Sequence, residues 1–415
     1  MNEQKKETMA KPTKKSGDTQ QTVQDAVTDD FSSDLIKAIN KEHNDKIAFN
    51  LGVDDAPTYV HRWISTGSRQ LDYIIGNRRG GGMPEGRIVE IQGPPGIGKS
   101  TLMAQIARST QRMGGIAVYI DTENATNPDT LANMGVDVAR RFVFVQSACT
   151  EEILSVIEST ILKARTMTKD VPVTVMWDSV SQSSPKAELE GDYDQNTIGL
   201  QARVLSKGMR KIANVIGGQK VLLVLVSQQR LKIGVMFGDP TTTSGGMAIP
   251  YSSSVRIRLD GGSAIKDKDE NVVGINVTAK TIKNKVAKPF RKVGFRILFG
   301  RGIFEEEEIF DLLREHCKNA KNGVSVGDKS VAIAGDGAWK TFTVTDIRTG
   351  EIGTEVKFYK NEFAQKVLNK PEYSEYVNAL MDAALILSGN DKPEDHLTYE
   401  GISEGDVRTA DELSA

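Results

Sequence analysis

The feature that most constrains the fold is the stretch GRIVEIQGPPGIGKSTLMAQIA, residues 86–107. An apolar run of strand-forming residues is followed by a turn with three glycines and then by a helical pattern of apolar residues. A strand, a glycine-rich turn and a helix in direct succession are typical of an α/β domain. The sequence therefore predicts strand, turn and helix here, with a phosphate group as the ligand of the turn.

Other apolar runs extend this pattern between Arg62 and Arg301: RIVEI, IAVYI, FVFV, VPVTVMW and VLLVLV alternate with helical segments. Runs that are apolar throughout indicate strands covered on both faces, as in a parallel sheet. The later runs SVRIRL, VTAKTI and FRILF alternate better and follow Gly- or Asp-rich turns, which indicates added antiparallel strands. We expect an α/β core with a mainly parallel central sheet.

The 415 residues divide into five expected segments. Residues 1–30 are polar and nearly without aromatic side chains, so we expect a disordered tail. Residues 31–62 contain an amphipathic helix, capped by Ser32 or Ser33, whose apolar Leu35, Ile36 and Ile39 need a surface to lie on. Residues 63–302 form the core.

The two remaining segments follow the core. Residues 303–390 are a smaller C-terminal α/β domain, with helices in EEEEIFDLLREHCK and SEYVNALMDAALILS. Residues 391–415 carry 8 acidic and 2 basic side chains, a net charge of −6, and are expected to be a disordered acidic tail.

The charge of the chain is unevenly distributed. The net charge is only −2, yet residues 201–300 hold 18 Lys or Arg against 5 Asp or Glu, a net charge of +13. The basic block suggests a binding site for a polyanion, and the acidic tail could compete with that polyanion for the site. The alternative is a solvated surface with a solubilising tail.

No apolar stretch approaches the ~20 residues that cross a bilayer, and the first residues lack the apolar segment of a secretory signal. We therefore expect a cytoplasmic protein without a membrane partner. Cys149 and Cys317 are too few for a disulfide framework or a thiolate metal site, and we interpret both as reduced residues without a special role.

The glycine turn matches the phosphate-loop pattern G-x-x-x-x-G-K-[ST], with a strand before it and a helix after it. Its residues are Gly93, Pro94, Pro95, Gly96, Ile97, Gly98, Lys99 and Ser100, followed by Thr101. Glycines let backbone N–H groups turn toward phosphate oxygens, Lys99 reaches the β and γ oxygens, and Ser100 is a Mg²⁺ ligand. The alternative is an ordinary glycine turn before a core helix, but such a turn would not need every fixed position of the phosphate-loop pattern to be present.

Two carboxylates follow buried strands. Asp178 ends VPVTVMWD and would hold a Mg²⁺-bound water at the carboxyl edge of the sheet, although an Asp there can also cap the next turn. Glu123 lies just after IAVYID and is the candidate that orients a water molecule in line with the γ-phosphate. The alternative is a surface glutamate.

Several motifs together extend beyond a general ATP site: STGSRQLD, SPKAELEGD, GLQARVLSKGMRKIA, LVSQQRLKIGVMFGDPTTTSGG and KTIKNKVAKPF. They resemble the bacterial RecA recombinase family from about Ile64 to Phe310, and GAW at 337–339 adds a weak match. The resemblance implies a RecA-like P-loop ATPase core that uses ATP and Mg²⁺. It also implies a helical filament of this protein on single-stranded DNA, and homologous pairing and strand exchange with double-stranded DNA in recombination and repair.

The resemblance also assigns roles to residues. It makes Lys99 and Glu123 catalytic, and Gln228 the sensor of the γ-phosphate at the base of a DNA-binding loop, residues 231–246. The loop contains four glycines, four hydroxyl residues and one proline, with apolar side chains that can insert between bases. The resemblance implies that DNA is bound by Arg230, just before the loop, and by four residues within it, Lys232, Ile233, Gly245 and Gly246.

A second implied DNA contact lies in EGDYDQNTIGLQARVLSKGMRK, with Ile198 probing between bases. Arg203, Ser206 and Arg210 occur at i, i+3 and i+7, a helical stripe that can follow a phosphate backbone, although a solvated basic face would look the same. Lys283 and Lys285 are two apart in an expected strand and, by the resemblance, reach the ATP of a neighbouring subunit.

The sequence departs from the family in three places. Asn127 and Thr130 stand where the family has an Asp and an adenine-stacking Tyr, so Asn127 is retained as a nucleotide-binding candidate with uncertain base recognition. Pro250 and Tyr251 replace an interface Lys and Phe, which puts coupling between subunits in doubt. The C-terminal domain diverges, so duplex DNA capture there is an expectation only.

Two other functions use the same phosphate loop. A ring-shaped helicase would need a separate N-terminal ring domain, whereas only about 60 mostly polar residues precede the core. A small-molecule kinase would need an acceptor pocket and an Arg-rich lid, and the glycine-rich segment 231–246 is a poor lid.

Overall fold

The computed structural model describes residues 31–168, 170–192, 199–231, 241–243, 246–320 and 323–387. It divides into two compact units, Met1–Tyr59 and Val60–Ala415. The tails expected at 1–30 and 391–415 lie outside the described residues.

In the first unit, residues 31–42 are helical. The helix already includes Phe31, so the expected cap at Ser32 or Ser33 is wrong, and both serines lie within the helix. Leu35 is exposed, while Ile36 and Ile39 are half-buried. Within the helix, the Asn40 side chain accepts hydrogen bonds from the backbone N–H groups of residues 47 and 48, which folds the following segment back on the helix.

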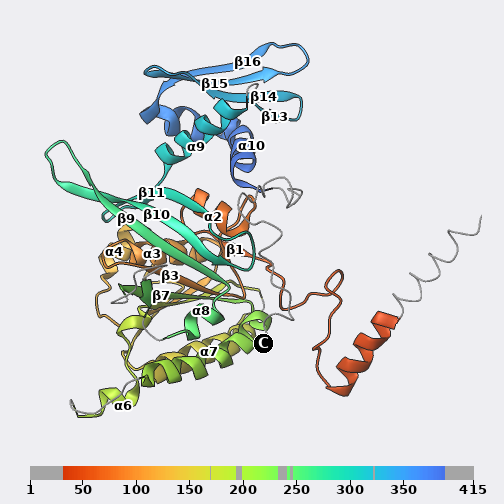
Figure 1. Ribbon diagram of the computed structural model, residues 1–415, viewed down its shortest axis with the longest axis vertical. Coiled ribbons are helices and arrows are strands. Elements are labelled where there is room, and N and C mark those ends of the chain that lie inside the picture. The colour runs from red at the N-terminus through yellow and green to blue at the C-terminus, as the bar shows by residue number, and fades with distance from the viewer. Residues whose placement is uncertain are drawn as a thin grey trace, which may run out of the picture. The chain divides into compact units, whose positions relative to one another are not determined.

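The second unit is built on a central sheet in the order β12-β11-β10-β9-β3-β7-β6-β4-β5, with β8 paired to β7 (Figure 1). Strands β9, β3, β7, β6, β4 and β5 are parallel, and β10 to β12 extend the sheet antiparallel. The strands are β3 Ile88–Gly93, β4 Ile116–Asp121, β5 Phe142–Gln146, β6 Val173–Asp178, β7 Val221–Leu231, β8 Thr241–Thr243, β9 Val255–Lys266, β10 Val272–Asn284, β11 Lys292–Leu298 and β12 Gly302–Phe304. A separate pair joins β1 Trp63–Ile64 to β2 Met83–Pro84. The α/β prediction with added antiparallel strands is confirmed.

Helices cover both faces of this sheet (Figure 1). One apolar cluster contains side chains of α2 and α3 and continues into the C-terminal part of the chain, and the other lies under α5 and α7. The helices are α2 Arg69–Gly76, α3 Lys99–Arg112, α4 Pro128–Asn133, α5 Thr150–Met167, α6 Lys186–Leu189, α7 Leu200–Gln219 and α8 Ala248–Ser252, with the 3₁₀ turn η1 Val180–Gln182. Because both faces are covered, β3, β6 and most of β7 are buried throughout.

Strand β5 departs from this pattern. The continuous apolar run FVFV predicts a strand covered on both faces, but Val143 and Phe144 are 47% and 45% exposed. The strand lies at the edge of the sheet, next to β4 alone. The prediction that this strand is covered on both faces is therefore wrong in the single chain. Apolar composition does not distinguish an interior strand from an apolar edge strand.

The C-terminal part is an antiparallel meander, β13-β14-β15-β16, packed against α9 and α10 (Figure 1). Its elements are α9 Glu306–Asn319, β13 Val324–Val326, β14 Lys329–Ala334, β15 Trp339–Asp346, β16 Ile352–Tyr359, α10 Ser374–Leu385 and the short turns η2 Lys360–Glu362, η3 Ala364–Leu368 and η4 Pro371–Tyr373. The Tyr73 hydroxyl and the Arg79 guanidinium both donate to Asp382, at 2.7 and 2.6 Å. These bonds join α10 to the helix α2 region.

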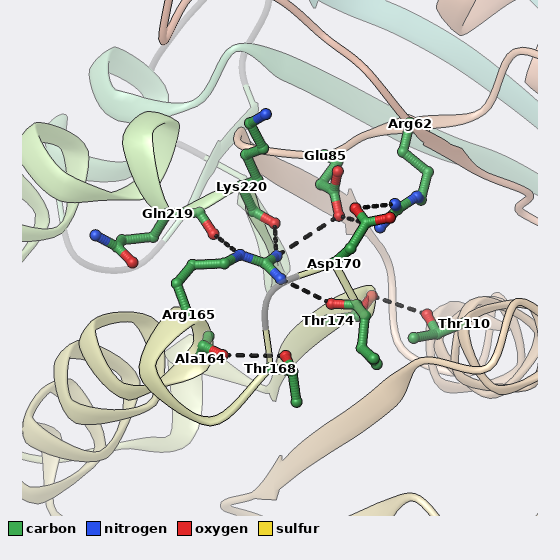
Figure 2. Close-up of polar contacts among 11 residues, drawn as sticks. Arg62, Glu85, Thr110, Ala164, Arg165, Thr168, Asp170, Thr174, Gln219 and Lys220 are labelled. Atoms are coloured by element: carbon green, nitrogen blue, oxygen red, sulfur yellow. Dashed lines mark hydrogen bonds and ion pairs between the residues drawn. The ribbon is translucent and has the colours of Figure 1, made fainter.

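A polar network fastens the amino-terminal edge of the parallel strands (Figure 2). Arg165 of α5 donates to the backbone carbonyls of Gln219, Lys220 and Val171 at 2.6–2.9 Å, and its guanidinium lies 3.8 Å from the buried Glu85 carboxylate. The network holds the end of α7 where β7 begins. Burial raises the pKa of Glu85, against the attraction of the nearby arginines.

Among the described residues, no helix is both long and apolar enough to span a membrane.

Candidate active site

The order of the strands brings four distant segments to one edge of the sheet. Strands β3, β7, β6 and β4 are consecutive neighbours and run parallel, so their carboxyl ends lie side by side. Gly93, Gln228 and Asp178 are at or near three of these ends, and Glu123 follows the fourth. In open parallel sheets, ligands bind at this edge.

The phosphate loop connects β3 to α3, which begins at Lys99 as the pattern predicts. Gly98 caps the helix with φ 92°, and a Cβ at this position would lie 2.1 Å from Cδ1 of Ile297. A side chain would therefore be strained by the backbone and crowded by β11. The glycine places the loop so that N–H groups at the start of α3 face the position of a phosphate.

The Lys99 ammonium forms hydrogen bonds within the phosphate loop. Its Nζ donates to the carbonyls of Gly93 at 3.0 Å and Pro94 at 2.7 Å. Burial lowers the pKa of Lys99, and the charges of Asp178 and Glu123 act in the opposite direction. The ammonium therefore lies close to both carboxylates and lines the same cavity as they do.

Ser100 and Asp178, the two predicted metal ligands, line the same cavity. Asp178 accepts a hydrogen bond of 2.7 Å from the Tyr119 hydroxyl and another from the Ser100 hydroxyl. Burial raises the pKa of Asp178, and the nearby Glu123 carboxylate raises it further. A hydroxyl and a carboxylate are hard oxygen ligands that suit Mg²⁺.

These two residues do not make a complete metal site. In the part of the chain that the structure describes, no three His, Cys, Asp or Glu side chains gather around a possible ion position. Mg²⁺ is usually held by one or two protein groups together with substrate phosphates and water. The residues therefore fit a Mg²⁺ ion that arrives with a nucleotide.

The loop that carries Glu123 is organised by Asp121, a residue that sequence reasoning missed. The Asp121 carboxylate accepts hydrogen bonds from the backbone N–H groups of residues 123 to 126, at 2.8–3.1 Å. Burial alone would raise the pKa of Asp121, but a hydrogen bond from the Thr126 side chain, together with the backbone bonds from residues 126, 123 and 124, lowers it. An Asp at a strand end before a polar turn is the signal that could have identified this role.

Glu123 contacts the predicted sensor directly. Its Oε1 accepts hydrogen bonds from the Ser179 hydroxyl at 2.7 Å and from Nε2 of Gln228 at 3.0 Å. The backbone N–H of Gln228 in turn donates to Ser181. A cavity of about 310 Å³ is lined by the loop together with Lys99, Ser100, Glu123, Asp178 and Gln228. The structure thus brings all three predicted catalytic residues to one cavity.

A second cavity of about 150 Å³ adjoins the first, with Ser100, Thr101, Glu123 and Asp178 in both linings. Asn127 and Thr130 line its far part. The Asn127 side chain caps α4, accepting from the backbone N–H groups of residues 129 and 130 at 2.8 and 3.2 Å. Its carbonyl oxygen is therefore engaged by the helix, so only its amide N–H₂ group is left for a ligand.

Comparison with known proteins agrees with this arrangement. A family model described as the RecA N-terminal domain matches residues 32–304. The RecA protein of Bacteroides thetaiotaomicron is 37% identical over 361 residues, which cover 85% of this chain and 98% of that protein. The chain belongs to the RecA family. Members of this family are DNA-dependent ATPases that use a nucleotide with Mg²⁺, bind DNA and self-assemble, so the chain is a RecA-like recombinase.

The predicted DNA stripe of this RecA-like chain lies on α7. Leu205 and Met209 are buried against the α5 side, whereas Arg203 and Arg210 are exposed and Ser206 is half-buried. Lys207, which the sequence analysis did not select, is exposed between the two arginines. The helix therefore presents a face with three cations at spacings of one helical turn.

The predicted DNA-binding segment after Gln228 starts and ends as a two-stranded ribbon. Arg230 pairs with Thr242 between β7 and β8, and Gly246, with φ 69°, follows the ribbon. A Cβ on Gly246 would lie 3.4 Å from Cβ of Ala202 on α7, so the end of the segment meets the start of the basic helix. Ile198, Lys232, Ile233 and Gly245 lie outside the described residues, as does the Arg230 side chain.

Lys283 and Lys285 do not line the nucleotide cavities of their own chain. Strand β10 ends at Asn284, so the expectation that both lysines lie in the strand is wrong for Lys285. A register shift between residues 281 and 283 changes the regular alternation just before this end. Nζ of Lys283 donates to the carbonyls of Pro250 at 2.6 Å and Tyr251 at 3.2 Å.

Proposed function

We propose that the chain hydrolyses ATP in the cavity between the phosphate loop and Gln228, and uses the bound state to grip single-stranded DNA. The observation that carries the proposal is the hydrogen bond between Glu123 and Gln228 at the base of the β7–β8 ribbon. It joins a candidate general base to the segment that leads into the DNA-binding loop.

In the proposed mechanism, the triphosphate lies along the loop amides from Gly93 to Ser100, and Lys99 exchanges its carbonyl partners for phosphate oxygens. A Mg²⁺ ion held near Ser100 and Asp178 would neutralise phosphate charge when bound. Glu123, fixed by Asp121 through the loop backbone, accepts the proton of the attacking water.

Gln228 carries the signal from this site to DNA. A γ-phosphate oxygen competes with Glu123 for the Gln228 amide, so the side chain turns toward the nucleotide and leaves the carboxylate free for water. Because Gln228 is followed directly by the ribbon, its new hydrogen bond orders the 231–246 segment against DNA, and loss of the phosphate releases it. The site would therefore couple hydrolysis to DNA release.

We also propose how the subunits assemble, where the protein acts and which cellular processes it serves. Subunits form a helical filament on single-stranded DNA, in which Lys283 and Lys285 reach the neighbouring nucleotide and the helix at residues 31–42 docks on the next subunit. The filament captures double-stranded DNA for homologous pairing. Because its proposed substrate is DNA, the proposed compartment is the cytoplasm, and the proposed roles are DNA repair and the SOS response.

The test is ATP turnover with and without single-stranded DNA. The proposal predicts a clear increase when DNA is added, and equal rates would contradict it. Electron microscopy with DNA and a slowly hydrolysed ATP analogue separates the assembly from that of a ring helicase, since the proposal predicts open filaments and closed rings would contradict it.

A further inference from the structure

A cavity of about 550 Å³ lies away from the nucleotide site, between α2, α3 and α10. Its lining combines residues 63–67 just before α2, the C-terminal end of α3 and Asn378 of α10. None of its lining residues belongs to the phosphate-loop cavities. The nucleotide mechanism gives it no role.

Three arginines that line this cavity make no ion pair with a carboxylate among the described residues, although the buried Glu305 attracts the Arg69 guanidinium. Arg108 and Arg112 are four apart on α3, and Arg69 begins α2. Arg108 donates only to the amide oxygen of Gln105, at 3.3 Å, and Arg69 to the amide oxygen of Asn378, at 2.8 Å. Burial lowers the pKa of Arg108, and the charge of Arg112 adds to this effect. Like charges held together in this way favour an anionic ligand.

Two buried donors in the lining also lack an acceptor. Nε2 of Gln105, whose side chain is 4% exposed, and Nε1 of Trp63 have no hydrogen-bond partner in the described part of the chain. A buried N–H group without a partner costs free energy, so such groups are rare unless a ligand or water supplies the acceptor. Both orphan groups are donors, so the polar groups left unsatisfied beside this cavity are complementary to an acceptor, although both atoms are covered and Nε2 of Gln105 faces Gly302.

The one acidic residue named in the lining, Asp72, is already engaged among the described residues. Asp72 accepts hydrogen bonds from the Ser65 hydroxyl at 2.5 Å and from the backbone N–H and hydroxyl of Thr66, both at 2.8 Å. Arg79, a fourth arginine of the lining, is neutralised by Glu375 and Asp382. The unsatisfied groups of the cavity are thus uniformly cationic or hydrogen-bond donors.

We propose that this cavity is a second anion site, which binds a small phosphate-bearing molecule through the guanidinium groups of Arg69, Arg108 and Arg112. Guanidinium groups bind phosphate oxygens in pairs, and a phosphate supplies acceptors to several donors at once. Since Arg108 belongs to α3 and Asn378 to α10, the bound anion braces the C-terminal domain against the ATPase core.

Pyrophosphate is the probe, measured by isothermal titration calorimetry on the full chain. The wild type binds two equivalents, one at each site. Lys99→Ala removes the equivalent at the phosphate loop, and Arg108→Gln with Arg112→Gln removes the other or weakens it about tenfold or more. The combined variant binds neither. The charge-matched control Arg140→Gln with Arg348→Gln changes exposed arginines outside the cavity and keeps both equivalents.

Two further readouts make the result decisive. Pyrophosphate raises the melting temperature of the Lys99→Ala protein, and this rise is lost when both cavity arginines are glutamine, although circular dichroism shows an unchanged fold. Affinity for a labelled oligonucleotide stays the same in the arginine variant. A single pyrophosphate equivalent in the wild type would overturn the proposal, as would a loss of oligonucleotide affinity without any loss of pyrophosphate binding.

Discussion

At the scale of single residues, the site depends on how Glu123 is supported. Asp121 shapes the loop from behind, and Ser179 and Gln228 hold the carboxylate from the front. The carboxylate is therefore placed before any nucleotide arrives, which reduces the reorganisation that the reaction requires. The sequence predicts Lys99 from the phosphate-loop pattern and Glu123 from its position after a strand end. For Asp121 it offers only the general signal of an Asp before a polar turn, and the four backbone contacts appear only in the folded loop.

The first prediction separates binding from turnover. Glu123→Gln keeps nucleotide affinity, because the phosphate contacts remain, but lowers turnover by roughly 10²–10⁴-fold, since the amide is a poor proton acceptor. Lys99→Ala instead loses nucleotide affinity. Fluorescent-nucleotide titration and phosphate release measure the two effects. Glu372→Gln, an exposed glutamate in the C-terminal part, is the control, and normal hydrolysis by Glu123→Gln would remove the catalytic assignment.

The second prediction concerns pH. Burial raises the pKa of Asp72 from its ordinary value of 3.8 to about 7, against hydrogen bonds from Ser65 and Thr66. Because the folded-state pKa is the higher one, folding favours the protonated carboxyl, and this stabilisation is complete below about pH 4 and is lost as the pH rises through about 7.

Asp72→Asn removes this titration. The free energy of unfolding of the wild type should fall more steeply between about pH 4 and 7 than that of the variant, by at most ~1.4 kcal/mol per pH unit. Urea denaturation at several pH values measures the difference. Parallel pH profiles for the two proteins would show that Asp72 is ionised throughout.

At the scale of elements, the sequence predicts the strands well because apolar runs and glycine turns are local signals. The RIVEI and VLLVLV runs become the buried neighbours β3 and β7. Three predictions fail. Ser32 and Ser33 lie inside a helix, β5 is an exposed edge, and β10 ends before Lys285 at an irregular register. The last two depend on strand neighbours that are distant in sequence.

The third prediction tests the network of Figure 2. Arg165→Ala leaves three backbone carbonyls and the buried Glu85 with fewer partners, so the free energy of unfolding should fall by about 3 kcal/mol. Lys163→Ala, which changes an exposed cation two residues earlier on α5, should have almost no effect. Equal stability of the two variants in urea denaturation would show that the network does not hold α7 in place.

The fourth prediction concerns the basic face of α7. Arg210 is exposed and, among the described residues, its side chain donates only to the backbone carbonyl of Ser206, so its charge is available to a DNA phosphate. Arg210→Ala should weaken binding to oligonucleotides of any sequence and reduce the salt dependence by about one counterion. Titration of a labelled oligonucleotide at several salt concentrations measures both, with Arg348→Ala as the control. An unchanged salt slope would contradict the contact.

At the scale of the whole molecule, function follows from the order of the strands. Each strand end can be identified in the sequence, but only the order β3-β7-β6-β4 brings Lys99, Glu123, Asp178 and Gln228 to one cavity. Several orders are compatible with the same runs, because local patterns do not fix strand neighbours. The fit of the C-terminal domain, through Tyr73, Arg79 and Asp382, also depends on pairs about 300 residues apart and could not be predicted.

The central claim is that Gln228 links the nucleotide to the DNA-binding segment. The most direct measurement is the affinity of the protein for single-stranded DNA with and without a slowly hydrolysed ATP analogue, in the wild type and in Gln228→Ala. The wild type should bind DNA at least about tenfold more tightly with the analogue. Gln228→Ala should bind the analogue and show no such gain. An equal gain in both proteins, or no gain in the wild type, would contradict the account.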